Sequence, residues 1–133
     1  MAAAAASRNT EGMIKHIDFV SVPVIDQKRA LAFYTEKLGF SVFTDQPFNE
    51  KQRWIELKVA GAQTKVVLFT PDGHEDQVGR FFNATFACDD VARTYAELRE
   101  KGVEFLGEPR KEPWGHMVIM KDSEGNQILL AAK

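Results

Sequence analysis

Asp26-Gln-Lys-Arg-Ala-Leu-Ala-Phe-Tyr-Thr-Glu-Lys-Leu-Gly39 is a predicted helix that begins at an aspartate and ends at a glycine. A second such segment, Asp89-Asp-Val-Ala-Arg-Thr-Tyr-Ala-Glu-Leu-Arg-Glu-Lys-Gly102, starts 63 residues later and has the same length. Aspartate is a good N-terminal cap, and glycine readily takes the left-handed conformation that ends many helices. An internal repeat of this kind predicts two similar modules that share one core, with a ligand site in the cleft between them.

Strands are predicted before and after each helix. Ile14–Val22 alternates and is rich in β-branched and aromatic residues, which is typical of a strand. The order is βαβββ twice, with a polar linker at Pro71–Arg80 between the copies, so we expect an α+β fold whose helices cover one face of the sheets. Module one spans about 14–70 and module two about 81–132. The other predicted strands lie at about 40–44, 52–59, 63–70, 81–88, 103–107, 115–121 and 126–132.

The bulk composition limits the partners and the location. The chain has 133 residues, a net charge of −2 and a pI near 5.9, which argues against a nucleic acid as the main partner. The single cysteine, Cys88, fits a reducing compartment, so we expect a cytoplasmic protein. No apolar run approaches the ~18 residues that span a membrane, so no membrane association is expected. Residues 1–12 are predicted to be a disordered extension, followed by one domain over 13–133.

The repeat resembles the vicinal oxygen chelate superfamily, which includes glyoxalase I, extradiol dioxygenases and bleomycin-resistance proteins. The motifs are Val24-Ile-Asp26…Ala32-Phe-Tyr34…Leu38-Gly-Phe40, and Pro113-Trp-Gly115…Lys121-Asp-Ser-Glu-Gly-Asn126. The resemblance implies that the paired modules form a cupped mixed sheet with helices on its outer face. It also implies a homodimer, because two chains commonly complete the cups between them in this superfamily, and enzymatic members hold a divalent metal in the cup.

The positions that would hold the metal in such relatives depart from the superfamily pattern. The resemblance places them at Phe19, Leu68, Asn83 and Leu129. Phenylalanine and leucine have no donor atom, and a neutral asparagine amide is a poor ligand for zinc. We therefore expect no metal and no other cofactor. A displaced metal site built from His116 and Glu56 is the alternative.

Strand alternation predicts which side chains line the cup. Phe19 brings Ser21 with it, and Trp54 and Glu56 would face inward toward the second module. Glu56 is the candidate general base of an acid–base pair whose second member would be His116. The predicted ligand-binding residues are Phe19, Ser21, Trp54, Glu56, Leu68, Asn83, Thr85, His116, Met117 and Leu129.

Three functions remain open from the sequence. The first is a metal-free protein that binds or sequesters a small, partly hydrophobic organic molecule, as bleomycin-resistance proteins do. The second is an enzyme, a lyase or isomerase of the glyoxalase type with a non-standard site. The third is an interaction module whose cup is filled by its own side chains.

Overall fold

A computed structural model describes residues 12–133, and the elements follow the predicted order. Residues 1–11 of the predicted disordered extension lie outside the described part of the chain. The first module contains β1 (Phe19–Val22), α2 (Gln27–Ala32), the π-helical segment η1 (Phe33–Lys37), β2 (Ser41–Pro47), β3 (Arg53–Lys58) and β4 (Lys65–Leu68). After the 3₁₀ turn η2 (Glu75–Gln77), the second contains β5 (Phe81–Ala87), α3 (Val91–Glu100), β6 (Glu104–Phe105), β7 (Arg110–Glu112), β8 (Gly115–Lys121) and β9 (Gln127–Ala132).

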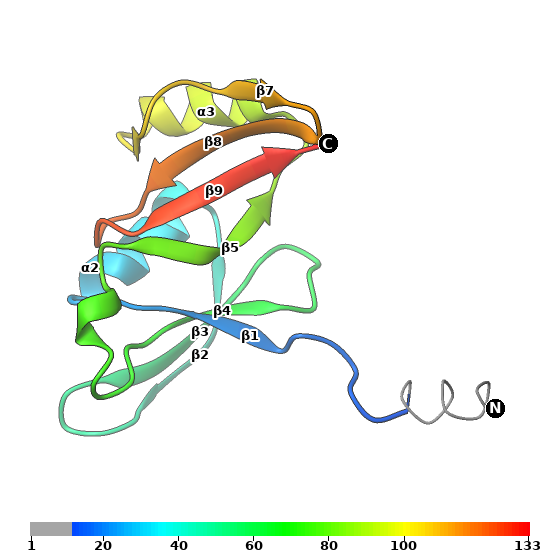
Figure 1. The fold of residues 1–133 in the computed structure, drawn as a ribbon. Helices are drawn as coiled ribbons and strands as arrows, with labels where there is room; N and C mark the ends of the chain where they lie inside the picture. Colours follow the sequence, from blue (N-terminus) through cyan, green and yellow to red (C-terminus); the bar gives the residue numbers. More distant parts are fainter. Residues whose placement is uncertain (1–11) are drawn as a thin grey trace.

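The two modules have the same strand order, which confirms the βαβββ repeat and the α+β fold (Figure 1). The first sheet runs β1-β4-β3-β2, with β1 parallel to β4. The second runs β5-β9-β8-β6, with β5 parallel to β9. The added strand β7, which was not predicted, pairs with β8. In each module the first strand therefore lies at one edge of its sheet.

β1 is shorter than the strand predicted over 14–22. Its pairing with β4 begins at Phe19, opposite Lys65. Just before that point the segment is held by two hydrogen bonds, from the Thr64 hydroxyl to the Ile17 carbonyl over 2.7 Å and from the Lys65 N–H to the Asp18 carbonyl over 2.9 Å. The Ile14 and Ile17 residues are 84% and 65% exposed. The alternating pattern is present, but residues 12–133 provide no neighbouring strand with which Ile14 and Ile17 could pair.

The two helices differ in length by one residue, although the two repeated segments of sequence have the same length. The Asp26 side chain caps α2 by accepting from the Arg29 N–H. In the second module the equivalent cap is Asp90, not Asp89, because Asp90 accepts from the Arg93 N–H. Both helices end at a glycine with positive φ, Gly39 and Gly102. The extra residue of the first helix is absorbed in η1, where the Leu38 N–H donates to the Phe33 carbonyl.

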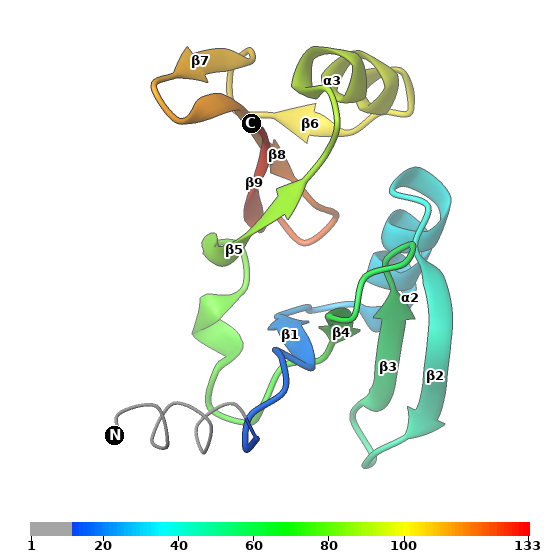
Figure 2. The same ribbon diagram turned by 90° about the vertical axis from the view of Figure 1, so that its right-hand side faces the viewer.

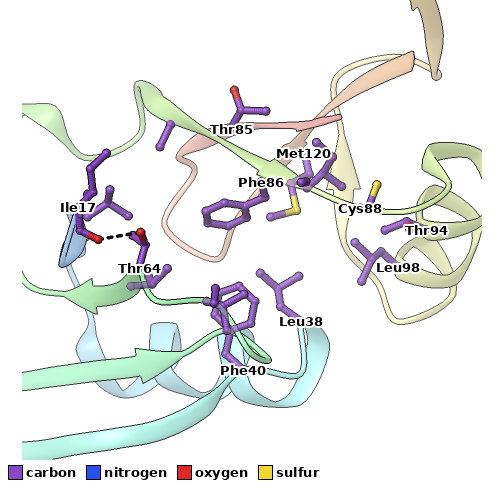
Figure 3. Close-up of a pocket in the computed structure, with 17 residues that line it drawn as sticks. Ile17, Leu38, Phe40, Thr64, Thr85, Phe86, Cys88, Thr94, Leu98 and Met120 are labelled. Atoms are coloured by element: carbon purple, nitrogen blue, oxygen red, sulfur yellow. Dashed lines mark hydrogen bonds between the residues drawn. The ribbon is translucent and has the colours of Figure 1, made fainter. Parts of the chain in front are cut away.

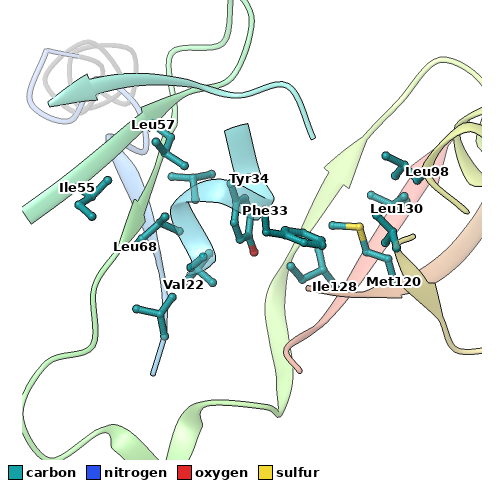
Figure 4. Packing of buried hydrophobic residues seen from close by; sticks show 14 of the residues in the cluster. Val22, Phe33, Tyr34, Ile55, Leu57, Leu68, Leu98, Met120, Ile128 and Leu130 are labelled. Carbon is teal, nitrogen blue, oxygen red and sulfur yellow. The ribbon is translucent and has the colours of Figure 1, made fainter. Parts of the chain in front are cut away.

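The core lies where helices cover one face of each sheet, and Tyr34 of η1 stands at the junction of the two modules (Figure 4). No part of Tyr34 is exposed, and its ring packs against Phe33 and Phe40. Phe40 in turn contacts Phe86 of the second module. The buried cluster draws on both modules and includes Val22, Ile55, Leu57, Val66, Leu68, Leu98, Val118, Met120, Ile128 and Leu130.

The two sheets stand at a wide angle to each other, and α2 and α3 both lie inside that angle (Figure 2). The surfaces inside the angle are the helix-covered faces of both sheets. The opposite faces point outward, one from each module. No helix within residues 12–133 has the length and apolar character needed to cross a membrane.

Candidate ligand-binding site

The outward face of the first sheet carries a group of four aromatic residues packed around Trp54. Phe19 and Trp54 meet edge to face, with their ring centroids 5.5 Å apart. Phe69 and Phe48 lie 5.1 Å and 6.0 Å from Trp54. Trp54 is thus at the centre, half-buried, and touches all three phenyl rings. We call Phe19, Phe48, Trp54 and Phe69 the aromatic cluster; its members Phe48 and Phe69 were not predicted from the sequence.

Glu56 holds the indole of this cluster. Trp54 Nε1 donates to Glu56 Oε1 over 2.8 Å, which the spacing of two residues on β3 allows because both side chains stand on the same face. None of the ion pairs within residues 12–133 involves Glu56. The arrangement fixes the plane of the indole and places a carboxylate beside an aromatic surface.

Leu68 was predicted to lie on this face, and that prediction is wrong. β1 and β4 pair Val22 with Leu68, and paired residues share a face of the sheet. Leu68 is therefore fully buried on the helix-covered side. Val67, which pairs with Glu56, takes the outward position. The segment Val66-Val-Leu-Phe69 is apolar at every position, so its sequence contains no alternation from which to choose the face.

Four predicted residues come together on the outward face of the second sheet. Thr85 pairs with Leu129 across β5 and β9. Exposure alternates along β5 from residue to residue, so Asn83, two residues earlier, stands on the same side as Thr85. β8 and β9 pair Ile119 with Leu129 and Met117 with Ala131, so Met117 also faces outward. The face combines apolar side chains with one amide and one hydroxyl.

His116 does not join this group, contrary to the prediction. It precedes Met117 on β8 and pairs with Ala132, so alternation points it toward the α3 side. There it lines a surface groove together with Trp114 and Asp89. Glu56 and His116 consequently lie in different modules and on different faces, which removes the predicted acid–base pair within one chain.

The two outward faces point away from each other. The side chains of the alternate positions, including Val20 on β1 and Phe86 on β5, line one cleft of about 570 Å³ inside the angle between the sheets (Figure 3). We call this the inter-module cleft. Phe19 and Leu129 therefore do not share a pocket within one chain. Ser21 and Asn83 meet only at the edges of the sheets, where both line a groove of about 350 Å³ between β1 and β5.

The residues at the superfamily's metal positions do not fit a divalent metal. Phe19 and Leu129 offer only carbon atoms, as do the predicted Leu68 and Val67, which takes its place on the outward face, and Asn83 offers a single amide. Residues 12–133 contain no group of three or more histidine, cysteine, aspartate or glutamate side chains placed to hold an ion. Chemistry that requires a metal at these positions has no ligand set in this chain.

A polar network, which we call the latch, joins the turn between β8 and β9 to the start of α2. Glu124 Oε1 accepts from the Ile25 and Asp26 N–H groups at 2.8 and 2.9 Å. Asp122 Oδ2 accepts from the Tyr34 hydroxyl at 2.7 Å and from Asn126 Nδ2 at 2.9 Å. The segment Asp122-Ser-Glu-Gly-Asn126 belongs to a motif on which the resemblance rests, but nothing in the sequence indicated its contact with the other module. The latch consists of Arg29, Tyr34, Asp122, Glu124 and Asn126.

The electrostatics of the latch favour a charged Glu124. Burial alone would raise the pKa of this carboxyl, but donors from Arg29, Asp26, Ser123 and Ile25 outweigh it and lower the pKa to about 2. Burial and the neighbouring Asp122 carboxylate raise the pKa of the Tyr34 hydroxyl well above its ordinary value. The latch therefore contains an ionised carboxylate and a neutral phenol at neutral pH, and it joins the two modules at this end of their junction.

Comparison with known proteins gives a consistent assignment. Residues 14–130 match the family described as the Glyoxalase/Bleomycin resistance protein/Dioxygenase superfamily. The protein YetH of Bacillus subtilis (strain 168) is 39% identical over 118 residues, which cover 89% of this chain and 98% of YetH.

Solved structures share the arrangement of both modules. A superfamily member from Sphaerobacter thermophilus DSM 20745 superposes with a TM-score of 0.82 at 31% identity, covering 91% of this chain and 99% of its own. TnmS3 from Streptomyces sp. CB03234, described as an antibiotic binding protein, superposes with a TM-score of 0.78 at 36% identity, covering 90% of this chain and 97% of its own.

Proposed function

The chain belongs to the glyoxalase/bleomycin resistance protein/dioxygenase superfamily, and from this premise we propose that it binds a small, partly hydrophobic organic molecule in a cup built by two copies of the chain. The observation that carries the proposal is the divergence of the two outward faces. Each face presents predicted binding residues, yet neither encloses a ligand by itself. The outward face of one chain's first module would meet the outward face of the partner's second module.

The exposed edges of the sheets support the proposal that a second copy of the chain binds to the first. β1 and β5 are edge strands, and exposed edges and apolar faces need cover. Large apolar side chains are exposed at Phe19, Phe48 and Phe81. An exposed apolar surface of this kind is characteristic of interaction sites, and a twofold homodimer would bring complementary faces together twice.

The aromatic cluster indicates the chemistry of the ligand. Trp54 offers a half-buried indole fixed by Glu56, and a flat apolar ligand gains contact area on such a surface. TnmS3 is described as an antibiotic binding protein and is 36% identical, which supports sequestration of an organic molecule here. Sequestration requires affinity alone, so the missing metal ligands do not impede it.

The other predicted functions have less support. A glyoxalase-type lyase or isomerase needs polarisation of a substrate oxygen, and neither a ligand set nor the Glu56–His116 pair is available in one chain. An interaction module with a filled cup predicts no ligand, which the experiment below distinguishes. A cytoplasmic location remains the prediction drawn from the single cysteine.

Titration of the Trp114→Phe variant tests the proposal, because Trp54 is then the only tryptophan. Doxorubicin serves as the first aromatic antibiotic probe, followed by a panel of uncharged aromatic antibiotics. We expect saturable quenching of Trp54 emission, lost when Leu129→Phe fills the partner face and retained in Ile25→Phe, a change at a residue that is 75% exposed. Light scattering should report a dimer. Absence of saturable quenching across the panel, or a monomer at micromolar concentration, contradicts the proposal.

A further inference from the structure

The two modules are joined differently at the two ends of their junction. At one end the β8–β9 turn reaches the start of α2 through the latch. The β3–β4 turn (59–64) is the first module's counterpart of the β8–β9 turn. The repeat therefore places it opposite the start of α3, as the β8–β9 turn lies opposite the start of α2. The β3–β4 turn contains no aspartate or glutamate. Within residues 12–133 no hydrogen bond connects it to α3. The second end of the junction is therefore open.

The inter-module cleft occupies this open end. Ala62 and Thr64 of the β3–β4 turn line one side of it, and Thr94 and Leu98 of α3 line the other (Figure 3). Cys88, directly after β5, lies beside Thr94 and Leu98 and is half-buried (Figure 3). The remaining wall consists mainly of core side chains, among them Val20, Leu38, Phe40, Val66, Phe86, Met120 and Leu130.

The lining carries no charge. All 17 lining residues are apolar, threonine or cysteine, and one of them, Thr85, directs its side chain away from the cleft (Figure 3). The Thr64 hydroxyl already donates to the Ile17 carbonyl. A charged ligand entering the cleft would lose its hydration without finding a counter-charge, which is strongly unfavourable. An uncharged ligand would bury apolar surface against the wall at no such cost.

We propose that the inter-module cleft is a second small-molecule site, which takes an uncharged, predominantly apolar ligand of two to three fused or linked rings. Its volume of about 570 Å³ lies within the range of roughly 300–1,000 Å³ typical of pockets for drug-sized ligands. The site is distinct from the proposed cup, because Val20 lines the cleft while its neighbour Phe19 points to the outward face. Dimerisation through the outward faces leaves the cleft free.

A pair of probes that differ in one charged group tests the ligand class. N-phenyl-1-naphthylamine is uncharged, and 8-anilinonaphthalene-1-sulfonate carries a sulfonate on the same ring system. The full-length protein should enhance the emission of the uncharged probe with saturation and bind the sulfonate at least about tenfold more weakly. Equal affinity for both probes, or no saturable enhancement, overturns the proposal.

Matched variants locate the site. Thr94→Trp places a large ring in the cleft and should weaken binding of the uncharged probe by about tenfold or more. Ala96→Trp adds the same side chain at an exposed position of α3 outside the cleft and should leave binding unchanged. Leu129→Phe, which fills the proposed cup, should also leave it unchanged, so failure at one site is distinguishable from failure at the other. Loss of binding in Leu129→Phe alone would assign the probe to the cup and overturn the proposal.

Cys88 provides an independent reporter because it is the only cysteine in the chain. The rate of its modification by N-ethylmaleimide should fall several-fold when the uncharged probe saturates the protein. An unchanged rate places the probe elsewhere and contradicts the proposal. Protection of Cys88 that appears without probe and grows with protein concentration shows that a second copy fills the cleft, which also overturns it.

Discussion

Arg29 and Glu124, 95 residues apart in the chain, form a two-point ion pair between the modules: Nε lies 2.9 Å from Oε2 and Nη2 lies 3.1 Å from Oε1. The Glu124 side chain is fully buried, whereas Arg29 is about half exposed. The same carboxylate also accepts backbone N–H groups at the start of α2. One side chain of the second module thus completes the N-terminal end of the first module's helix.

Replacing Glu124 should make the free energy of unfolding less dependent on pH in the acidic range. Its folded-state pKa of about 2 lies below the ordinary value of 4.5. The stabilisation is therefore present above pH 4.5 and is lost as the pH falls through about 2. The shift corresponds to about 3 kcal/mol. Urea denaturation of Glu124→Gln should show a lower free energy of unfolding at pH 7 and a flatter profile between pH 5 and 2. Glu97→Gln, at an exposed position on α3, should match the unmodified protein; equal profiles for both variants contradict the expectation.

Tyr34→Phe should destabilise the junction of the modules. The change removes the 2.7 Å hydrogen bond to Asp122 and leaves the packing of the ring in place. Loss of a buried hydrogen bond to a charged acceptor costs about 1.5–3 kcal/mol. Tyr95→Phe is the control, because within residues 12–133 the Tyr95 hydroxyl hydrogen-bonds only to the exposed Arg99, at 3.2 Å. Thermal unfolding should show a lower midpoint for Tyr34→Phe alone, and an unshifted midpoint would mean that the latch contributes little.

Mixing two inactive variants should restore one of the two proposed cups in every mixed dimer. Trp54→Ala removes the centre of the aromatic cluster, and Leu129→Phe fills the opposite face. In a dimer that joins module one of each chain to module two of the other, a mixed pair contains one doubly altered cup and one intact cup. Calorimetric titration of doxorubicin, or of the panel member that binds best, should detect binding in the co-expressed mixture but not in either variant. A cup formed within one chain would give no recovery.

The protein purified without chelator should contain well under one metal ion per chain. The positions at Phe19, Val67, Asn83 and Leu129 supply one amide oxygen among them, which is too weak a ligand set for zinc, nickel or iron. Elemental analysis measures the content directly. A near-stoichiometric metal would require a different site and would contradict the absence of a ligand set described above.

The repeat and its helix signals predicted the modules because they depend on local sequence. Asp26 and Gly39 determine the ends of a helix through contacts a few residues away. The choice of face for β4 could not be predicted in this way, because Leu68 and its neighbours are all apolar and only the pairing with β1 determines the register. The prediction for His116 was wrong for a related reason: His116 and Met117 are adjacent on one strand, and adjacent residues cannot both line the same face.

The way in which the two modules pack against each other could not be predicted from the sequence. Glu124 stands in a polar turn, where an exposed carboxylate is the ordinary expectation. Its partners Ile25 and Asp26 come from the other copy of the repeat, and only the three-dimensional packing brings them together. The divergence of the outward faces follows from that packing as well.

The π-helical segment η1 explains how the two copies can differ in length and still fold alike. A single added residue turns everything beyond it by about 100° around an α-helix, which would rotate Leu38 and the following strand out of register. By widening one turn between Phe33 and Lys37, the helix accommodates the residue locally and keeps both of its ends in place. The first copy can therefore tolerate an insertion at its centre that would be disruptive in a helix of uniform pitch, and the duplicated halves were free to diverge in length without separate changes at either junction.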